Sequence, residues 1–128
     1  RPDFPNSGIC QTFREKAVDY GFVERYPKGK EAITGIAHEP WHFRYVGAPH
    51  AAIMTELGLT LEEYHDFLKQ YPHGEKCFLY RNGNQIIEVS YGKATAGADA
   101  EFEIEDDIPY SVSGNNADGF VLAEWTSR

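Results

Sequence analysis

The first forty-six residues combine one helical pattern with several short strand-like patterns. Apolar residues recur every three or four positions from Ile9 to Tyr20, which predicts an amphipathic helix. Ser7 before this run and Gly21 after it are residue types that begin and end helices. The β-rich runs that follow predict short strands at residues 22–26, 31–36 and 41–46. We expect these strands to form a small antiparallel sheet with the helix packed on it.

Two further helices are predicted before the pattern changes. Residues 49–57 have a helical composition and are followed by Gly58, a common helix terminator. Thr60 and Glu63 have the spacing of a capping box, in which each side chain bonds the other residue's backbone N–H. A helix is therefore expected to start at Thr60 and to continue to about Tyr71. Its apolar positions recur at helical spacing: Leu61, Tyr64, Phe67 and Leu68.

Two-residue alternation replaces the helical spacing after about residue 76. Cys77–Tyr80 and Gln85–Tyr91 flank Asn82-Gly83, which is the strongest short signal for a β-hairpin with a type I′ turn. Further strands are expected at residues 100–105, 110–113 and 119–125. In residues 100–105, Phe102 and Ile104 would share one face. These patterns predict a unit of four or five strands.

The predicted fold class is α+β, with one domain over residues 1–74 and a small all-β accessory domain over residues 75–128. The linker between them contains Pro72 and Gly74. The chain of 128 residues is 41% hydrophobic and 14% aromatic, which favours a packed globule over disorder. The aromatic residues of the strands are expected to be core residues and not a ligand platform.

Charge and cysteine content exclude several classes of function. The net charge of −8 argues against nucleic-acid binding, which needs clustered Lys and Arg. Six acidic residues between Asp99 and Asp107 are expected to form a solvated surface, because no calcium-loop motif accompanies them. The only two cysteines, Cys10 and Cys77, lack metal-binding spacing and are expected to be small core residues. No membrane-spanning segment is present in the sequence.

The segment from His38 to His42 has a composition suited to metal-dependent hydrolysis. It places two imidazoles and the Glu39 carboxylate within five residues. A zinc hydrolase needs neutral imidazole or carboxylate ligands and a carboxylate close to the attacking water. Glu39 and His42 would face opposite sides of an unbroken strand, so this chemistry requires Pro40 to break the strand. We expect His65 and His73 to be solvated, and His50 to cap a helix or to contact solvent.

Glu-x-x-His alone is a weak pattern. It lacks the second histidine of the helical His-Glu-x-x-His motif, and Pro40 excludes a helix interior. From the residues alone, a core-packed Trp41 and His42 is the competing interpretation.

The surrounding segment closely resembles the D-alanyl-D-alanine carboxypeptidases and dipeptidases of the VanY and VanXY type. The resemblance covers about residues 1–70. It is carried above all by Glu-Pro-Trp-His-Phe-Arg-Tyr-Val-Gly at residues 39–47 and Leu-Glu-Glu-Tyr-His at residues 61–65. These zinc peptidases act in peptidoglycan metabolism and glycopeptide resistance.

The resemblance implies that Glu39 is the catalytic base and His42 the third zinc ligand. The first two ligands of the family lie in an upstream motif, Ser-x-His-x-x-Gly-x-Ala-x-Asp, which is absent here. We therefore expect this chain to belong to a longer protein whose upstream part supplies them, so that the isolated chain is incomplete and inactive.

The implied function of the parent protein is zinc-dependent hydrolysis of the terminal D-Ala-D-Ala bond of peptidoglycan precursors. One alternative is a non-catalytic cell-wall or partner-binding module on a peptidase-like scaffold. Another is a related L,D-peptidase or endopeptidase. The sequence leaves the compartment open between the bacterial cytoplasm and the cell envelope.

Overall fold

A computed structural model of the chain describes residues 7–97 and 99–127. The chain divides into two compact units, Arg1–Tyr64 and His65–Arg128. The division lies within a helix, upstream of the linker at residues 72–75 where the sequence predicts a domain boundary. The predicted α+β class is confirmed, and the assignment of the second part as an accessory domain stays a prediction. No helix among the described residues is long and apolar enough to cross a bilayer.

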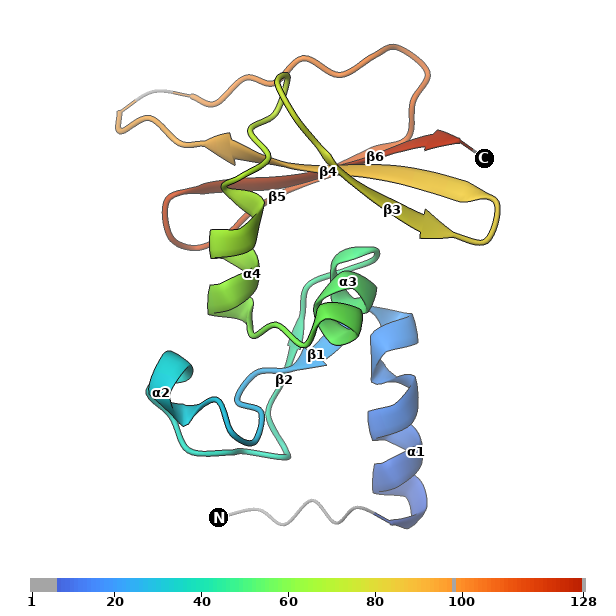
Figure 1. Ribbon diagram of the computed structural model, residues 1–128, viewed down its shortest axis with the longest axis vertical. Helices are drawn as coiled ribbons and strands as arrows, with labels where there is room; N and C mark the ends of the chain where they lie inside the picture. Colours follow the sequence, from blue (N-terminus) through green and yellow to red (C-terminus); the bar gives the residue numbers. More distant parts are fainter. Residues whose placement is uncertain (1–6, 98, 128) are drawn as a thin grey trace. The chain divides into compact units, whose positions relative to one another are not determined.

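The first unit contains helices around a two-stranded antiparallel sheet (Figure 1). Its elements in chain order are α1 (Gly8–Lys16), η1 (Ala17–Tyr20), β1 (Phe22–Glu24), α2 (Glu31–Thr34), β2 (Phe43–Tyr45) and α3 (His50–Leu57). Helix α4 (Leu61–Leu68) begins in this unit and ends in the next. Helix α3 packs against η1 and β1.

The predicted N-terminal helix is confirmed, although its last turn narrows to a 3-10 helix at Ala17. Ser7 precedes the helix but its side chain makes no capping hydrogen bond. Gly21 ends the helix with a φ of 87°, a left-handed conformation that glycine adopts without steric cost. A Cβ atom at this position would lie 2.9 Å from the Gly47 Cα. Glycine therefore allows the chain after β2 to approach the end of η1.

The strand predicted at residues 31–36 is wrong, because Glu31–Thr34 forms the short helix α2. Its turn is closed locally, by the Gly35 N–H donating to the Glu31 carbonyl at 2.9 Å. Gly35 has a φ of 78°, so a helix-ending glycine outweighs the β preference of Ile33 and Thr34. The other two predicted strands are confirmed in shorter form and pair antiparallel as β1 and β2.

The two predicted helices after β2 are confirmed as α3 and α4. The Thr60 N–H donates to the Glu63 carboxylate at 2.9 Å, and the Glu63 N–H donates to the Thr60 hydroxyl at 3.1 Å. These are the two bonds of the predicted capping box. The Thr60 amide and then the Lys30 ammonium, at 2.9 Å, lower the pKa of Glu63.

The second unit is built on a four-stranded antiparallel sheet in the order β3-β4-β6-β5. Its strands are β3 (Phe78–Asn82), β4 (Gln85–Lys93), β5 (Tyr110–Gly114) and β6 (Gly119–Ser127). The connection from β4 to β5 crosses one face of the sheet (Figure 1). On that face, the Phe102 ring fills the space above Gly92, where a Cβ atom would lie 2.2 Å from it. Phe67 and Tyr71 pack against Phe78.

Two details of the predicted strands are wrong. The β3–β4 turn is centred on Gly83-Asn84, because Asn82 already pairs with Gln85. Only Gly83 of these two residues has a positive φ, 61°, which fits a type II′ turn and not a type I′ turn. Residues 100–105 form no strand. Their alternating exposure is nevertheless present, because Phe102 and Ile104 are half-buried whereas the neighbouring acidic residues are exposed.

A buried asparagine organises the turn between β5 and β6. Asn115 is only 5% exposed. Its Oδ1 accepts the backbone N–H groups of Ala117, Asp118 and Gly119 at 2.9 to 3.1 Å. Its Nδ2 donates to the Asp118 carboxylate at 3.1 Å. One side chain thus satisfies three backbone donors that a tight turn leaves without strand partners.

Candidate active site

Residues Glu39–His42 form a tight turn between α2 and β2. The His42 N–H donates to the Glu39 carbonyl at 3.2 Å, which closes a four-residue turn. Pro40 occupies the second position of this turn, where its fixed φ is favourable. The strand break that the sequence requires at Pro40 is therefore present.

The turn brings the two predicted site residues together. The Glu39 Oε1 atom lies 3.3 Å from the His42 Nδ1 atom. The Glu39 side chain is 23% exposed and that of His42 is 46% exposed. A carboxylate and an imidazole thus lie side by side at the surface, where another molecule or another part of a longer protein can reach them.

The backbone that follows β1 holds this turn at both ends. The Arg25 N–H donates to the His42 carbonyl at 2.9 Å. The Glu39 N–H donates to the Tyr26 carbonyl at 3.1 Å. The Tyr26 and His42 rings meet edge to face, with their centroids 5.0 Å apart and their planes at 90°. The position of the turn therefore depends on the chain immediately after β1.

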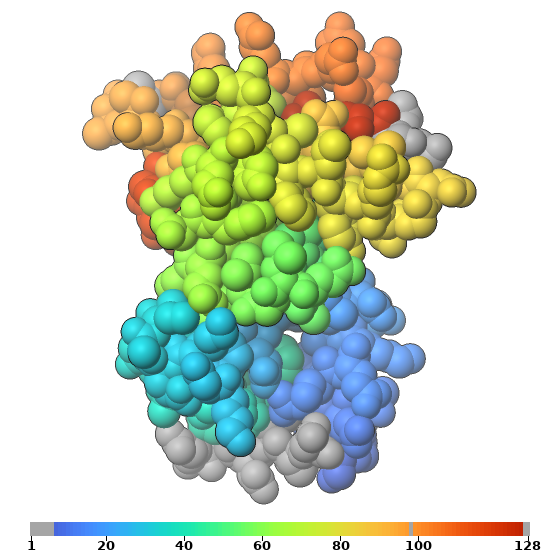
Figure 2. All heavy atoms as spheres, viewed as in Figure 1, coloured from blue at the N-terminus to red at the C-terminus, as the bar shows by residue number. Residues whose placement is uncertain are grey.

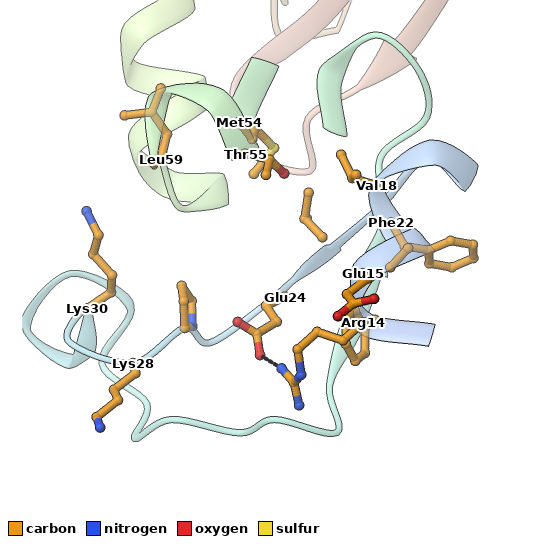
Figure 3. Close-up of a pocket in the computed structure, with 15 residues that line it drawn as sticks. Arg14, Glu15, Val18, Phe22, Glu24, Lys28, Lys30, Met54, Thr55 and Leu59 are labelled. Carbon is orange, nitrogen blue, oxygen red and sulfur yellow. Dashed lines mark hydrogen bonds and ion pairs between the residues drawn. The ribbon is translucent and has the colours of Figure 1, made fainter. Parts of the chain in front are cut away.

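The side of the turn nearest α1 is held by an ion pair. Arg14 of α1 pairs with Glu24 of β1 (Figure 3). A second guanidinium nitrogen of Arg14 donates to the Pro40 carbonyl at 3.4 Å. The His38 Nε2 atom lies 3.7 Å from the Glu24 carboxylate. His38 is thus associated with Glu24 and not with the Glu39–His42 pair.

A hollow of this unit lies near the turn. It has a volume of about 540 Å³ and is lined by residues of α1, β1 and α3, including Arg14, Glu24, Phe43 and Met54. Figure 2 shows it between the blue atoms of α1 and the cyan atoms of the segment after β1. Glu39 and His42 do not line this hollow, so the carboxylate–imidazole pair and the hollow are separate features of the unit.

The donor set at the turn suits zinc in type but not in number. Imidazole nitrogen and carboxylate oxygen are both common zinc ligands. Catalytic zinc sites use three protein ligands, and the described part of the chain contains no group of three His, Cys, Asp or Glu side chains arranged to hold a metal. Glu39 and His42 can therefore form only part of a zinc centre.

Two of the other histidines have more protected positions than expected. His50 is only 3% exposed, and its Nδ1 atom lies 2.6 Å from the Tyr64 hydroxyl. Burial raises the pKa of Tyr64. His73 contacts the Ser90 hydroxyl at 2.9 Å through Nδ1 and the Glu103 carbonyl at 2.7 Å through Nε2. The expectation of helix capping or solvent contact is therefore wrong for both residues.

His73 belongs to a polar cluster on the second sheet, but the geometry does not suit nucleophilic catalysis. Ser90 and Glu124 both approach its Nδ1 atom, Glu124 at 3.6 Å. A serine hydrolase needs the nucleophile and the acid on opposite ring nitrogens. Burial, followed by the Glu88 carboxylate, raises the pKa of the Cys77 thiol to about 11. That thiol is therefore a poor nucleophile.

Glu124 should make the stability of this unit depend on pH. Burial is the main reason why its pKa is raised. A raised native pKa means that stability is lost as the pH rises from the ordinary glutamate value through the native value. We expect Glu124→Gln to stabilise the chain at pH 7.5 and to lose this advantage near pH 4, as measured by urea unfolding. The exposed Glu101→Gln serves as the control. A Glu124→Gln effect that is equal at both pH values would contradict this prediction.

Comparison with known proteins places the turn in a defined family. The family model described as VanY, D-alanyl-D-alanine carboxypeptidase, matches residues 1–48. A D-alanyl-D-alanine carboxypeptidase of Enterococcus faecium is 42% identical over 108 residues, 84% of this chain. The crystal structure of the vancomycin resistance D,D-dipeptidase VanXYg matches 98% of the chain, with 49% identity and a TM-score of 0.88. The chain belongs to the VanY/VanXY-type peptidase family.

The likeness to VanY/VanXY-type peptidases includes both units. The VanXYg match extends over nearly the whole chain, so the four-stranded sheet has a counterpart in that protein. The sequence had indicated a resemblance only to about residue 70. A third relative, the bifunctional dipeptidase and carboxypeptidase VanXYC of Enterococcus gallinarum, is 52% identical over 69 residues, 54% of this chain.

The chain spans only part of each relative. It covers 34% of the E. faecium carboxypeptidase, 36% of VanXYC and 49% of VanXYg.

The sequence pointed to Glu39 and His42 but not to the residues around them. Arg14, Arg25 and Tyr26 contact the turn through its backbone or rings. Glu24 contacts His38, which precedes the turn. Arg25 and Tyr26 lie within the segment that resembles VanY/VanXY-type peptidases, next to Pro27. Their place beside Pro27 at the end of a predicted strand was the available signal. The pairing of Arg14 with Glu24 depends on packing, and the sequence gives no signal for it.

Proposed function

We propose that this chain supplies the general base, Glu39, and one zinc ligand, His42, to a D-Ala-D-Ala peptidase centre completed by another part of a longer protein. The turn at Pro40 carries this proposal, because it places an accessible carboxylate and an imidazole 3.3 Å apart. The family membership supports the substrate class. The relatives are named as carboxypeptidases or dipeptidases that act on D-alanyl-D-alanine.

His42 would hold the metal, with the remaining ligands contributed from outside this chain. Zinc, when bound, would polarise the scissile carbonyl and make the attacking water more acidic. The two backbone bonds at residues 39 and 42 fix the turn relative to β1. The side chains therefore start from a restrained position, which reduces the conformational entropy lost when a site is assembled.

Glu39 would take a proton from the attacking water and return it to the leaving amine. A carboxylate within hydrogen-bond reach of the water can do both. The Glu39 side chain is partly exposed, so its carboxylate is accessible to substrate and solvent. Its contact with the His42 Nδ1 atom also suits a second role, in which the carboxylate orients the imidazole. Substitution by glutamine separates the two roles, because it removes the base and keeps a side chain of the same size.

The alternative is a non-catalytic wall-binding or partner-binding module on a peptidase-like scaffold. It is favoured by the lack, among the described residues, of a third metal-binding side chain near His42. The two functions differ in whether the complete protein contains zinc and releases D-alanine.

The 128-residue chain alone is expected to bind zinc weakly and to release no D-alanine. One imidazole and one carboxylate do not make a tight site. Isothermal titration with zinc, together with a D-alanine assay on D-Ala-D-Ala and on a pentapeptide precursor, measures both properties. The His42→Ala chain is the control and should lose the remaining weak binding. Robust turnover by the isolated wild-type chain would refute the proposal that other parts of the protein complete the centre.

A further inference from the structure

We infer that Tyr26 is a positioning residue that sets the plane of the His42 imidazole, and that the Arg25–Glu62 ion pair holds Tyr26 in place. This inference rests on the proposed function, because it assigns a purpose to the orientation of His42. It goes further by connecting the turn to α4 through three side chains outside the Glu-x-x-His pattern.

The first step is the restraint on the imidazole itself. The side chain of His42 is nearly half exposed, so packing alone restrains its ring weakly. The Glu39 carboxylate, 3.3 Å from Nδ1, restrains the direction of one ring atom. A contact through one atom still allows the ring to tilt about it. A second contact, of a different kind, is needed to fix the plane.

The Tyr26 ring provides that contact. The two centroids are 5.0 Å apart and the planes are at 90°, which is a favourable edge-to-face arrangement for aromatic rings. Tilting of the imidazole would destroy this geometry. The carboxylate and the tyrosine ring therefore restrain different motions of the same side chain.

The Tyr26 ring is in turn restrained by Arg25. The Arg25 guanidinium carbon lies 4.8 Å from the centroid of the ring, within the range of a cation–π contact. Two guanidinium nitrogens of Arg25 donate to the two carboxylate oxygens of Glu62 at 2.9 and 2.8 Å. A bidentate pair fixes the orientation of the guanidinium plane as well as its position. The start of α4 thus holds the Arg25 guanidinium beside the ring.

The partial exposure of these side chains argues for a geometric purpose. Tyr26 is half-buried and does not belong to the buried core of the unit. The Arg25 and Glu62 side chains are 18% and 37% exposed, and ion pairs of this exposure add little to stability. Their combined effect is to keep an aromatic ring in a defined position beside His42.

Two substitutions of Tyr26 separate ring orientation from the hydroxyl group and from simple bulk. Tyr26→Phe keeps the ring, whereas Tyr26→Leu keeps only an apolar side chain. In the 128-residue chain, the carbon-bound protons of the His42 imidazole should keep their ring-current shifts in Tyr26→Phe and lose them in Tyr26→Leu. NMR measures these shifts without any metal or substrate.

In the complete protein, Tyr26→Leu should weaken zinc binding about tenfold, the lower end of the effect of outer partners of metal ligands. We expect kcat to fall while KM changes little, because Tyr26 is proposed to act through the orientation of His42 and not by binding the substrate. Tyr26→Phe should resemble the wild type in zinc affinity and kcat. The matched control is Tyr20→Leu, since Tyr20 is a 72% exposed tyrosine of the same unit.

Arg25→Lys and Glu62→Gln test the rest of the connection without altering the ring. Each removes the bidentate pair and should weaken zinc binding, by less than Tyr26→Leu does. If Tyr26→Leu fails to fold, the zinc affinities of these two variants still test whether the connection positions His42.

Unchanged ring-current shifts and unchanged zinc affinity in Tyr26→Leu would overturn the inference. Equal damage by Tyr26→Phe and Tyr26→Leu would also overturn it, because the hydroxyl would then be the active group. If Glu39→Gln retains full turnover, the proposed function fails, while the NMR result still decides the role of Tyr26.

Discussion

Glu39→Gln in the complete protein should reduce kcat for D-alanine release about a hundredfold or more, with zinc content unchanged. Glutamine keeps the shape of the side chain but cannot accept the proton of the attacking water. Its amide can still contact His42, so the ligand should remain in place. The measurement combines steady-state release of D-alanine with metal analysis of the purified variant.

Two variants serve as controls for this experiment. Glu31→Gln alters an exposed carboxylate of α2 and should leave kcat unchanged. His42→Ala should lose zinc as well as activity, because it removes a metal ligand. Near-normal turnover by Glu39→Gln would remove Glu39 from the mechanism. Loss of zinc by Glu39→Gln would instead show that Glu39 acts by orienting His42.

Asn115→Ala should destabilise the second unit by about 3 kcal/mol. The substitution leaves three backbone N–H groups of a tight turn without their acceptor. Each buried donor left unsatisfied costs about 1 to 3 kcal/mol, and water entering the turn recovers part of this. Urea unfolding followed by Trp125 fluorescence in a Trp41→Phe background reports on this unit, because Trp125 lies in β6.

Neighbouring substitutions show whether the Asn115 oxygen is responsible. Asn115→Asp keeps an acceptor but loses the amide that donates to Asp118, so an intermediate loss is expected. Asn116 is exposed and has a φ of 60°, and Asn116→Gly should therefore change stability little. If Asn115→Ala were as stable as Asn116→Gly, the side-chain network at this turn would contribute nothing.

Elements with strong local signals were predictable from the sequence. Helix α4 begins with the predicted capping box, because Thr60 and Glu63 interact within one turn. Helix α3 ends at Gly58, as the sequence indicates. These features depend on residues three or four positions apart, which a pattern along the chain can reveal.

Other elements depend on partners that are distant in the sequence. The strand-like alternation at residues 100–105 correctly marks Phe102 and Ile104 as inward-facing, yet the segment crosses the sheet without pairing. Its neighbour is the face formed by β4 and β6, where Phe102 contacts Phe120. Alternation reports which side is covered, and a covering segment produces the same pattern as a strand.

The candidate site also combines features set by nearby residues with features set by residues that are distant in the sequence. Glu39 and His42 could be proposed as site residues because they are close in sequence and lie in a segment that resembles known peptidases. The Arg25–Glu62 pair joins residues 37 positions apart. Glu62 lies in the Leu-Glu-Glu-Tyr-His segment at residues 61–65, but nothing in the sequence connects it with Arg25. The residues proposed to carry chemistry were therefore accessible to sequence analysis, and most of the residues that contact them were not.

The antiparallel ladder of β1 and β2 fixes which side chains surround the turn. The two strands pair over only three residues, with Glu24 opposite Phe43. A shift of one residue would move Tyr26 to the opposite face and exchange it with Arg25. An insertion or deletion between residues 38 and 43 is therefore expected to disrupt the site, because it would displace the turn relative to the paired strands. The α2 segment can change in length at far lower cost, because its backbone bonds are local. Insertions and deletions should therefore be tolerated in the α2 segment, which precedes the Glu39–His42 turn, and not in the turn itself.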